Sequence, residues 1–272
     1  MKTTAICFPF DLFGSGGTAE GAKAIADALR EILDDNRRET VRTRAATYQN
    51  NVRLRELAFE SLDDYHNWRA MGREAARKAL GKNRFLIWLT GNHLGALPVY
   101  EELAAVGGTV VVQFDAHLDI QNFTDSPRHP SHGNFLLHAA TPIPVVINIG
   151  HRDLLLTQEH IQRYYQRAVP AVDLARRFDA VLEETLAACQ SAQRVFLDID
   201  CDVLDAEAFP AVTHPVPFGL NPADLLRFID ALWSDRVAGV ALSEFDPGRD
   251  RNDRCLATLA WLLEYLLLRR YE

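Results

Sequence analysis

The feature that most constrains the fold is the alternation of short, continuous apolar runs with helical patterns of apolar residues. The runs are typical of buried strands and occupy Ala5–Pro9, Arg84–Leu89, Thr109–Phe114, Pro144–Ile149, Arg194–Ile199 and Val237–Ser243. The helical patterns cover Thr18–Leu33, a segment from about Ala96, Asp153–Ala168, Leu174–Ser191, Pro222–Ser234 and Arg254–Arg269. Strands that alternate with helices form a parallel sheet with both faces covered. We therefore expect a three-layer α/β/α fold with a mostly parallel central sheet.

Length and charge limit the classes of protein and of partner. No Pro/Ser-rich linker or block of charge divides the 272 residues, so we expect residues 1–272 to form a single domain. The formal net charge of −8 argues against nucleic acid as the main partner, because binding of phosphates needs clustered Lys and Arg. The longest apolar stretch near the C-terminus, Leu256–Leu268, contains Glu264 and is too short to cross a bilayer.

The cysteines and the first residues indicate a cytoplasmic location. The four cysteines are far apart in the sequence and form no Cys-x-x-Cys pair; they are Cys7, Cys189, Cys201 and Cys255. This spacing does not favour disulfides and fits a reducing compartment. The apolar stretch at the N-terminus is too short for a signal peptide.

Acidic residues and histidines follow four of the predicted strands. His93 comes after the strand that ends at Leu89, and the sequence DAHLD (115–119) comes after Phe114. The sequence DIDCD (198–202) and Glu244 follow two later strands. Since parallel α/β sheets bind ligands at the carboxyl ends of their strands, we expect these groups to converge on one site.

The composition of this cluster indicates metal binding. Alternate residues of an extended segment point the same way, so Asp115, His117 and Asp119 can face one point, as can the alternate aspartates of DIDCD. One Asp-x-Asp after a strand is more often a turn or a helix cap, but so many clustered carboxylates repel one another unless cations neutralise them. Two divalent metals that share carboxylates would do so, and oxygen ligands with one histidine per metal suit Mn²⁺. A water between two such metals becomes hydroxide near neutral pH.

Other histidines and Cys201 are expected to have structural positions. His66 and His160 lie in polar helical patterns and are predicted to be surface residues. His138, on a predicted helix, is expected to serve in packing. Cys201 lies between two candidate ligands in sequence and is expected to point to the opposite, buried face.

These motifs, taken together and in order, resemble those of the arginase, agmatinase and formiminoglutamase hydrolases. They are GNH (91–93), DAHLD (115–119), SHGN (131–134), DCDVLD (200–205) and EFDP (244–247). FDLFGSGGTAEGAKAI (10–25) is similar to the opening Gly-rich loop of that family, and IGHRD (149–153) to its central segment. The resemblance implies an arginase-like fold and a manganese hydrolase that cleaves a guanidino or amidino group of a small amine, releasing urea or a related amide. It also implies two Mn²⁺ per chain and a homo-oligomer, either a trimer or a hexamer.

The resemblance also implies a ligand set. One metal would take His93, Asp115, Asp119 and Asp200. The second would take Asp115, His117, Asp200 and Asp202. The register set by Leu204 and Asp205 leaves Asp198 outside both sets, as a residue that supports a ligand.

Three further roles follow from the same resemblance. Asp119 would bond the bridging hydroxide and pass its proton to the leaving amine, and His132 would shuttle protons. Glu244 would hold the guanidinium, which suits a planar cation with many donors. His214 stands where the family has a threonine near the substrate, so we count it with His132 and Glu244 as substrate-binding.

Several positions depart from the family pattern. Asn92 replaces the aspartate that precedes the first histidine ligand. The positions that would hold the amino and carboxylate groups of arginine are unmatched; they are Gln121, Arg128, Pro130 and Leu155. We therefore expect L-arginine to be a poor substrate.

Two other classes of protein stay open at this stage. Histone deacetylases share the fold but use one Zn²⁺, so a deacetylase-like amidohydrolase is less compatible with six intact ligands. A non-catalytic descendant of the family would be favoured by the loss of a ligand, and none is lost.

Overall fold

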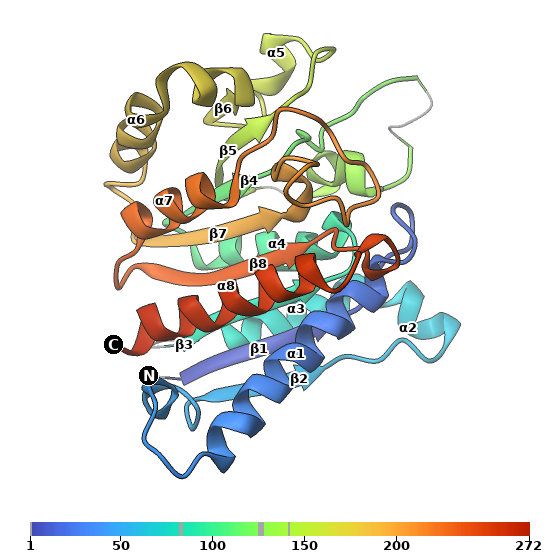
Figure 1. Ribbon diagram of the computed structural model, residues 1–272. Helices are drawn as coiled ribbons and strands as arrows, with labels where there is room; N and C mark the ends of the chain where they lie inside the picture. The colour runs from blue at the N-terminus through green and yellow to red at the C-terminus, as the bar shows by residue number, and fades with distance from the viewer. Residues whose placement is uncertain (1, 82–83, 125–127, 141) are drawn as a thin grey trace.

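The central element is an eight-stranded sheet in which every neighbouring pair is parallel (Figure 1). The computed structural model describes residues 2–81, 84–124, 128–140 and 142–272. The strand order is β2-β1-β3-β8-β7-β4-β5-β6. The strands are β1 (Lys2–Phe8), β2 (Val52–Glu56), β3 (Arg84–Thr90), β4 (Thr109–Phe114), β5 (Val145–His151), β6 (Arg167–Pro170), β7 (Arg194–Asp200) and β8 (Val237–Ser243).

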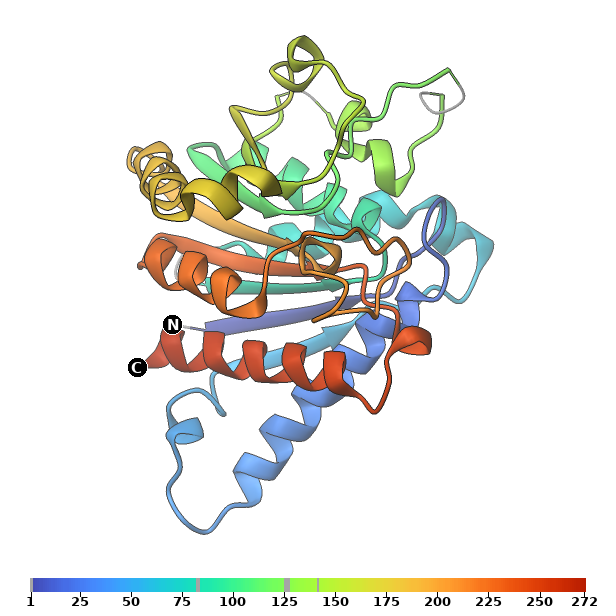
Figure 2. The ribbon, with the colours of Figure 1, turned by 45° about the horizontal axis from the view of Figure 1, so that its top comes forward.

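Helices cover both faces of the sheet, which confirms the predicted three-layer α/β/α fold (Figures 1 and 2). One face carries α1 (Thr18–Arg38), α6 (Ala171–Ala188), α7 (Pro222–Leu232) and α8 (Arg254–Tyr271). The other face carries α3 (Trp68–Ala79) and α4 (Leu97–Val106). The remaining α-helices of the described chain are short: α2 (Leu62–His66) and α5 (Gln158–Ile161). Among the described residues, no helix combines the length and the apolar character needed to cross a bilayer.

Strand β3 shows why the apolar runs are continuous. Phe85, Ile87 and Leu89 belong to one hydrophobic core, whereas Leu86 and Trp88 belong to the core on the opposite face. Successive side chains of a strand point to opposite faces, so a strand buried on both faces must be apolar at every position.

The predicted helix at Asp153–Ala168 is wrong. Only Gln158–Ile161 is helical there, and Arg167–Pro170 forms β6, which pairs with β5. A carboxylate oxygen of Asp153 accepts hydrogen bonds from the backbone nitrogens of Leu155 (2.9 Å) and Leu156 (2.8 Å). Aspartate therefore stabilises a local turn in place of the first helical turn.

One of the remaining histidine expectations also needs revision. His160 is half-buried, and its Nε2 lies 2.8 Å from the backbone oxygen of Ile120, so it is not a simple surface residue. His138 ends a 3₁₀ helix, His132–His138, and not an α-helix. His66 is exposed and Cys201 is fully buried in the core, as expected.

The fold brings the loops after the strands to one edge of the sheet. In Figure 1 the loops that follow β1, β4 and β7 all lie on the right, where the strand arrows end. Helix α1 packs closely against this edge, because a Cβ added at Gly21 would lie 1.8 Å from the backbone oxygen of Phe245. This contact fixes the segment that carries Glu244.

Candidate metal centre

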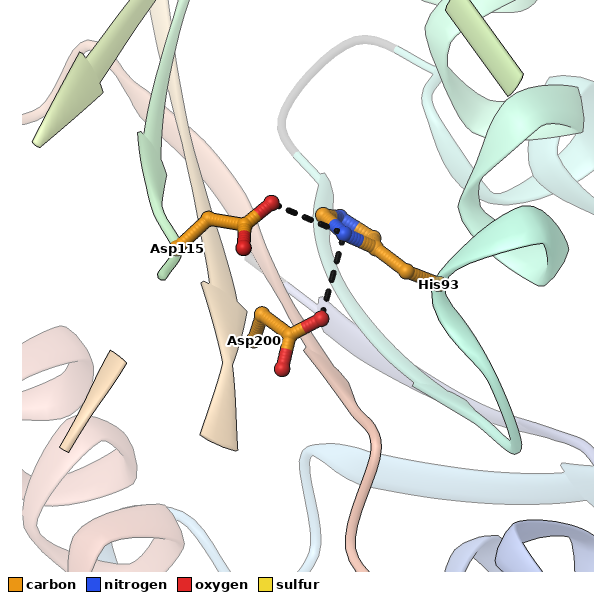
Figure 3. A group of neighbouring side chains, drawn as sticks. All are labelled: His93, Asp115 and Asp200. Atoms are coloured by element: carbon orange, nitrogen blue, oxygen red, sulfur yellow. Dashed lines mark ion pairs between the residues drawn. The ribbon is translucent and has the colours of Figure 1, made fainter. Parts of the chain in front are cut away.

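Three strands of the sheet, β3, β7 and β4, place a histidine and two aspartates around one point (Figure 3). His93 begins a 3₁₀ helix after β3, Asp115 directly follows β4, and Asp200 ends β7. Nδ1 of His93 lies 3.2 Å from Oδ2 of Asp115 and 3.2 Å from Oδ2 of Asp200. Oδ2 of Asp119 is 2.9 Å from the same nitrogen. The four groups expected for the first metal are therefore together.

A second group shares Asp115 with the first. Nδ1 of His117 lies 2.9 Å from Oδ2 of Asp202 and 3.9 Å from Oδ1 of Asp115. The structure thus holds two sets that could each bind a metal, with ligand atoms within 4.8 Å of one another. They are His93, Asp115 and Asp200, and Asp115, His117 and Asp202.

Divalent cations would stabilise the atoms of this cluster better than the atoms stabilise one another. Nδ1 of His93 and Oδ2 of Asp115 are buried and have no hydrogen-bond partner among the described residues. Burial, together with the charge of Asp119, raises the pKa of Asp115 to about 7, and burial with the charge of Asp202 raises the pKa of Asp200 well above its usual range. A bound cation would give these atoms a partner and remove the repulsion between the carboxylates.

Asp198 contacts the opposite side of the His93 ring. Its Oδ2 lies 2.9 Å from Nε2 of His93 and accepts a 2.6 Å hydrogen bond from the hydroxyl of Tyr100. The aspartate is fully buried. A carboxylate on the second ring nitrogen fixes the tautomer and the orientation of a histidine. Tyr100, on α4, was not identified from the sequence, because nothing local marks a tyrosine on a helix as a partner of a strand residue.

Glu244 and His132 form a pair beside the metal groups. Nδ1 of His132 lies 3.3 Å from Oε1 of Glu244 and 3.3 Å from the hydroxyl of Ser15. The same oxygen of Glu244 accepts a 2.8 Å hydrogen bond from the backbone nitrogen of His93. Burial alone would lower the pKa of His132, but the carboxylate of Glu244 outweighs it and the pKa is raised. Ser15 was not singled out from the sequence, although it lies in the Gly-rich loop noted above.

His214 stands across from His132, with 5.4 Å between the ring centroids. Burial and the neighbouring His132 lower the pKa of His214. These rings line a cavity of about 230 Å³ together with the metal groups. Its lining is His93, His117, Asp119, Gln121, His132, Gly133, Asp200, Asp202 and His214.

Comparison with known families identifies the family to which this chain belongs. The family model described as "Arginase family" matches residues 2–268. The chain belongs to the arginase family. It is accordingly a hydrolase that acts on C–N bonds of amidines, as the resemblance implied.

Relatives and solved structures agree with this membership. The formimidoylglutamase of Halobacterium salinarum is 28% identical over 269 residues, which cover 95% of this chain and 85% of the relative. The crystal structure of arginase from Bacillus subtilis matches with a TM-score of 0.81 and 23% identity, covering 98% of each chain. The formimidoylglutamase structure from Bacillus subtilis subsp. subtilis str. 168 matches with a TM-score of 0.82 and 19% identity, covering 100% of this chain and 88% of the other.

Two positions that depart from the arginase-family pattern have clear contacts. Nδ2 of Asn92 donates a 3.0 Å hydrogen bond to the backbone oxygen of Leu12, so Asn92 connects the first ligand loop to the opening loop. Gln121 lies beside the SHGN segment, since its backbone nitrogen donates a 3.0 Å hydrogen bond to the oxygen of Gly133. Leu155, which also departs from the family pattern, is 72% exposed.

Proposed function

We propose that this arginase-family hydrolase binds two Mn²⁺ and cleaves a guanidino or amidino group from a small amine, releasing urea or a related amide. The observation that carries the proposal is the pair of ligand groups that share Asp115, with unpartnered buried donor atoms between them. An oxygen-rich set with one histidine on each side suits Mn²⁺. We assign His93, Asp115, Asp119 and Asp200 to one ion, and Asp115, His117, Asp200 and Asp202 to the other.

The ions, when bound, supply Lewis acidity and activate water as the nucleophile. The protein side chains bind the substrate and move its protons. Glu244, which is 3% exposed, provides a fixed negative charge for a cationic guanidinium or amidinium. Asp119 lies in the cavity, accepts the proton of the nucleophile and passes it to the leaving amine, and His132 shuttles protons.

His214 completes the substrate site without adding charge. Its lowered pKa keeps the imidazole neutral near pH 7, so it does not repel a cationic substrate. With Leu155 and Pro130 at positions that would need polar groups, the amino and carboxylate groups of L-arginine would be left unpaired. We therefore propose that L-arginine is a poor substrate.

The test is metal analysis followed by a panel of guanidino and amidino compounds, assayed for urea and ammonia after loading with Mn²⁺. We expect two ions per chain in the parent protein and selective loss of one in Asp202→Asn. One tightly bound Zn²⁺ per chain, with no second site filled by Mn²⁺ and turnover of acetylated amines, would favour the deacetylase-like alternative. Two bound ions without turnover of any compound would favour a non-catalytic member.

We also propose that residues 1–272 act as one catalytic domain in a cytoplasmic homo-oligomer, a trimer or a hexamer. The sheet supports the first part, because its strands come from both ends of the chain. The four buried, free cysteines support a reducing compartment. Sedimentation velocity of the Mn²⁺-loaded protein measures the oligomer directly.

A further inference from the structure

Large apolar side chains are exposed in loops at the same edge of the sheet as the catalytic cavity. Among the described residues, six of the twelve exposed large hydrophobic side chains lie in loops that follow strands β1, β4, β5 and β7. We call these six the apolar rim. They are Leu12, Phe13, Phe123, Leu154, Leu155 and Phe218. Single exposed apolar residues are normal on a protein surface, but a cluster beside a binding cavity indicates a ligand or a partner.

Three of the four loops of the rim are joined to a residue of the cavity. The backbone oxygen of Phe13 accepts a 3.3 Å hydrogen bond from the backbone nitrogen of His132. Phe123 follows Gln121 of the cavity lining by two residues. The guanidinium of Arg152 donates a 2.6 Å hydrogen bond to the backbone oxygen of Asp202 and so ties the loop of Leu154 and Leu155 to the second metal group. The rim loops therefore border the cavity, and Leu154 and Phe218 line a second pocket, which Arg152 separates from it.

Two aromatic residues of the rim are held in a conformation that L-residues avoid. Phe13 has φ 61° and Phe218 has φ 62°, and their side chains are 56% and 84% exposed. A left-handed backbone and an exposed phenyl ring both cost free energy, and strain of this kind is concentrated at functional sites.

Hydrogen bonds hold the rim loops rigidly. A carboxylate oxygen of Asp205 accepts a 2.9 Å hydrogen bond from the nitrogen of Gly219, which fixes the turn at Phe218. Asp153 fixes the turn that carries Leu154 and Leu155. The rim is thus preorganised, which lowers the entropy cost of covering it with a ligand.

Four charged groups of these loops, Asp11, Arg152, Asp153 and Asp205, are already used within the protein, whereas Arg128 and Glu207 are exposed. The carboxylate of Asp11 accepts hydrogen bonds from the backbone nitrogens of Gly17 (3.0 Å) and Ala19 (3.3 Å). Asp153 and Asp205 bond backbone nitrogens, and Arg152 bonds four backbone oxygens. These groups are poorly placed to pair with a charged substrate tail, whereas the rim offers apolar contacts.

We infer that the substrate joins a cationic guanidino or amidino head to an uncharged, apolar tail, which the apolar rim covers. This inference rests on the proposed function. It makes Phe218, Leu154 and Leu155 specificity-determining residues.

The test compares substrates that differ only at the end of the tail. The Mn²⁺-loaded protein is assayed with n-pentylguanidine, with agmatine, in which an ammonium replaces the terminal methyl, and with γ-guanidinobutyrate. The last compound is included because Arg128 lies exposed in the loop of Phe123. We expect kcat/KM for n-pentylguanidine to exceed both others by about tenfold or more, the effect of covering roughly two methylene groups. Equal or faster turnover of either charged compound would overturn the inference and leave the proposed function standing. If no guanidine or amidine were turned over, the proposed function itself would be overturned.

Variants of the rim separate a substrate site from a subunit contact. Phe218→Gly should fold, because glycine readily adopts the positive φ of this position. In this variant the preference for n-pentylguanidine over agmatine should fall about tenfold, through a change in KM. Leu154→Ser with Leu155→Ser should lower the same preference. Val41→Ala, at an exposed residue beyond the end of α1, is the matched control and should leave it unchanged. Rim variants that change the sedimenting mass but not the preference would identify the rim as a subunit interface and overturn the inference.

Discussion

The contact between Asp198 and His93 allows a quantitative test of how this chain binds its first metal. Asp198→Asn keeps the shape of the side chain but removes its charge. A hydrogen bond to a charged group contributes about 1.5–3 kcal/mol and a neutral one about 0.5–1.5 kcal/mol. The 2.9 Å contact to Nε2 of His93 should therefore lose about 1–2 kcal/mol. We expect affinity for one of two Mn²⁺ to fall about tenfold, within the range typical of such supporting residues.

The assay is a competition titration of Mn²⁺ against a chelator, with circular dichroism to show that each variant is folded. Tyr100→Phe is the matched control, because it removes the other 2.6 Å contact to the same oxygen and leaves the charge of Asp198 in place. Its effect should be smaller. Parent-like affinity for both ions in Asp198→Asn would refute the supporting role. The assignment of Asp202, and not Asp198, as a ligand would be wrong if two results were found together. Excess Mn²⁺ would fail to fill one site in Asp198→Asn, and Asp202→Asn would still bind both ions.

Three further predictions concern charge and packing. Glu244→Gln should keep both metals, since an amide oxygen still accepts the bond from His93 nitrogen, yet lose about a hundredfold in kcat because a neutral amide cannot offset a cationic substrate; near-normal kcat would contradict this. Hydrogen bonds from Arg77 and Arg73 lower the pKa of Glu102, so its ionised form stabilises the fold above the ordinary glutamate pKa and this stability is lost as pH falls through the lowered value. Glu102→Gln should therefore lower the free energy of unfolding by about 1 kcal/mol at pH 7, and the difference should shrink in urea titrations as pH falls below the ordinary glutamate pKa of 4.5. Gly21→Ala should lose about 1–3 kcal/mol because its Cβ would overlap Phe245 oxygen, whereas Gly16→Ala, with open space around it, should melt like the parent.

The sequence predicts the interior of this fold better than its edges. Strands buried on both faces, such as β3, β4 and β7, are marked by continuous apolar runs, and their ends were predicted to within one residue. The edge strand β2 has the sequence VRLRE, in which only one face is apolar, so it was not predicted. Edge strand β6 is four residues long and was taken for the end of a helix. A short strand with one neighbour leaves little signal in local sequence, because its stability comes from pairing with a distant segment.

In the candidate site, too, some features were predictable from the sequence and others were not. Candidate ligands follow strands, so topology alone brings His93, Asp115 and Asp200 to one edge, and the structure places them within reach of one another. Contacts that come from another layer were not predictable. Tyr100 contacts Asp198 from α4. The left-handed backbone at Phe218 depends on the hydrogen bond between Gly219 and Asp205 in its loop. Such contacts depend on packing between elements and leave no periodic pattern.

The position of β8 has a consequence for how this chain folds during synthesis. β8 is the last of the described strands in the sequence, yet it lies inside the sheet, between β3 and β7. Until it emerges from the ribosome, β2-β1-β3 and β7-β4-β5-β6 are two separate sheets, each with an open edge where β8 will insert. His93 belongs to the first of these sheets, and Asp115 and Asp200 belong to the second. The first metal set, His93, Asp115 and Asp200, can form only when β8 joins the two halves, whereas the second, Asp115, His117 and Asp202, lies within one half. Until β8 is made, both halves expose strand edges that could pair with another chain, and the stability from a metal bound by the first set is not yet gained.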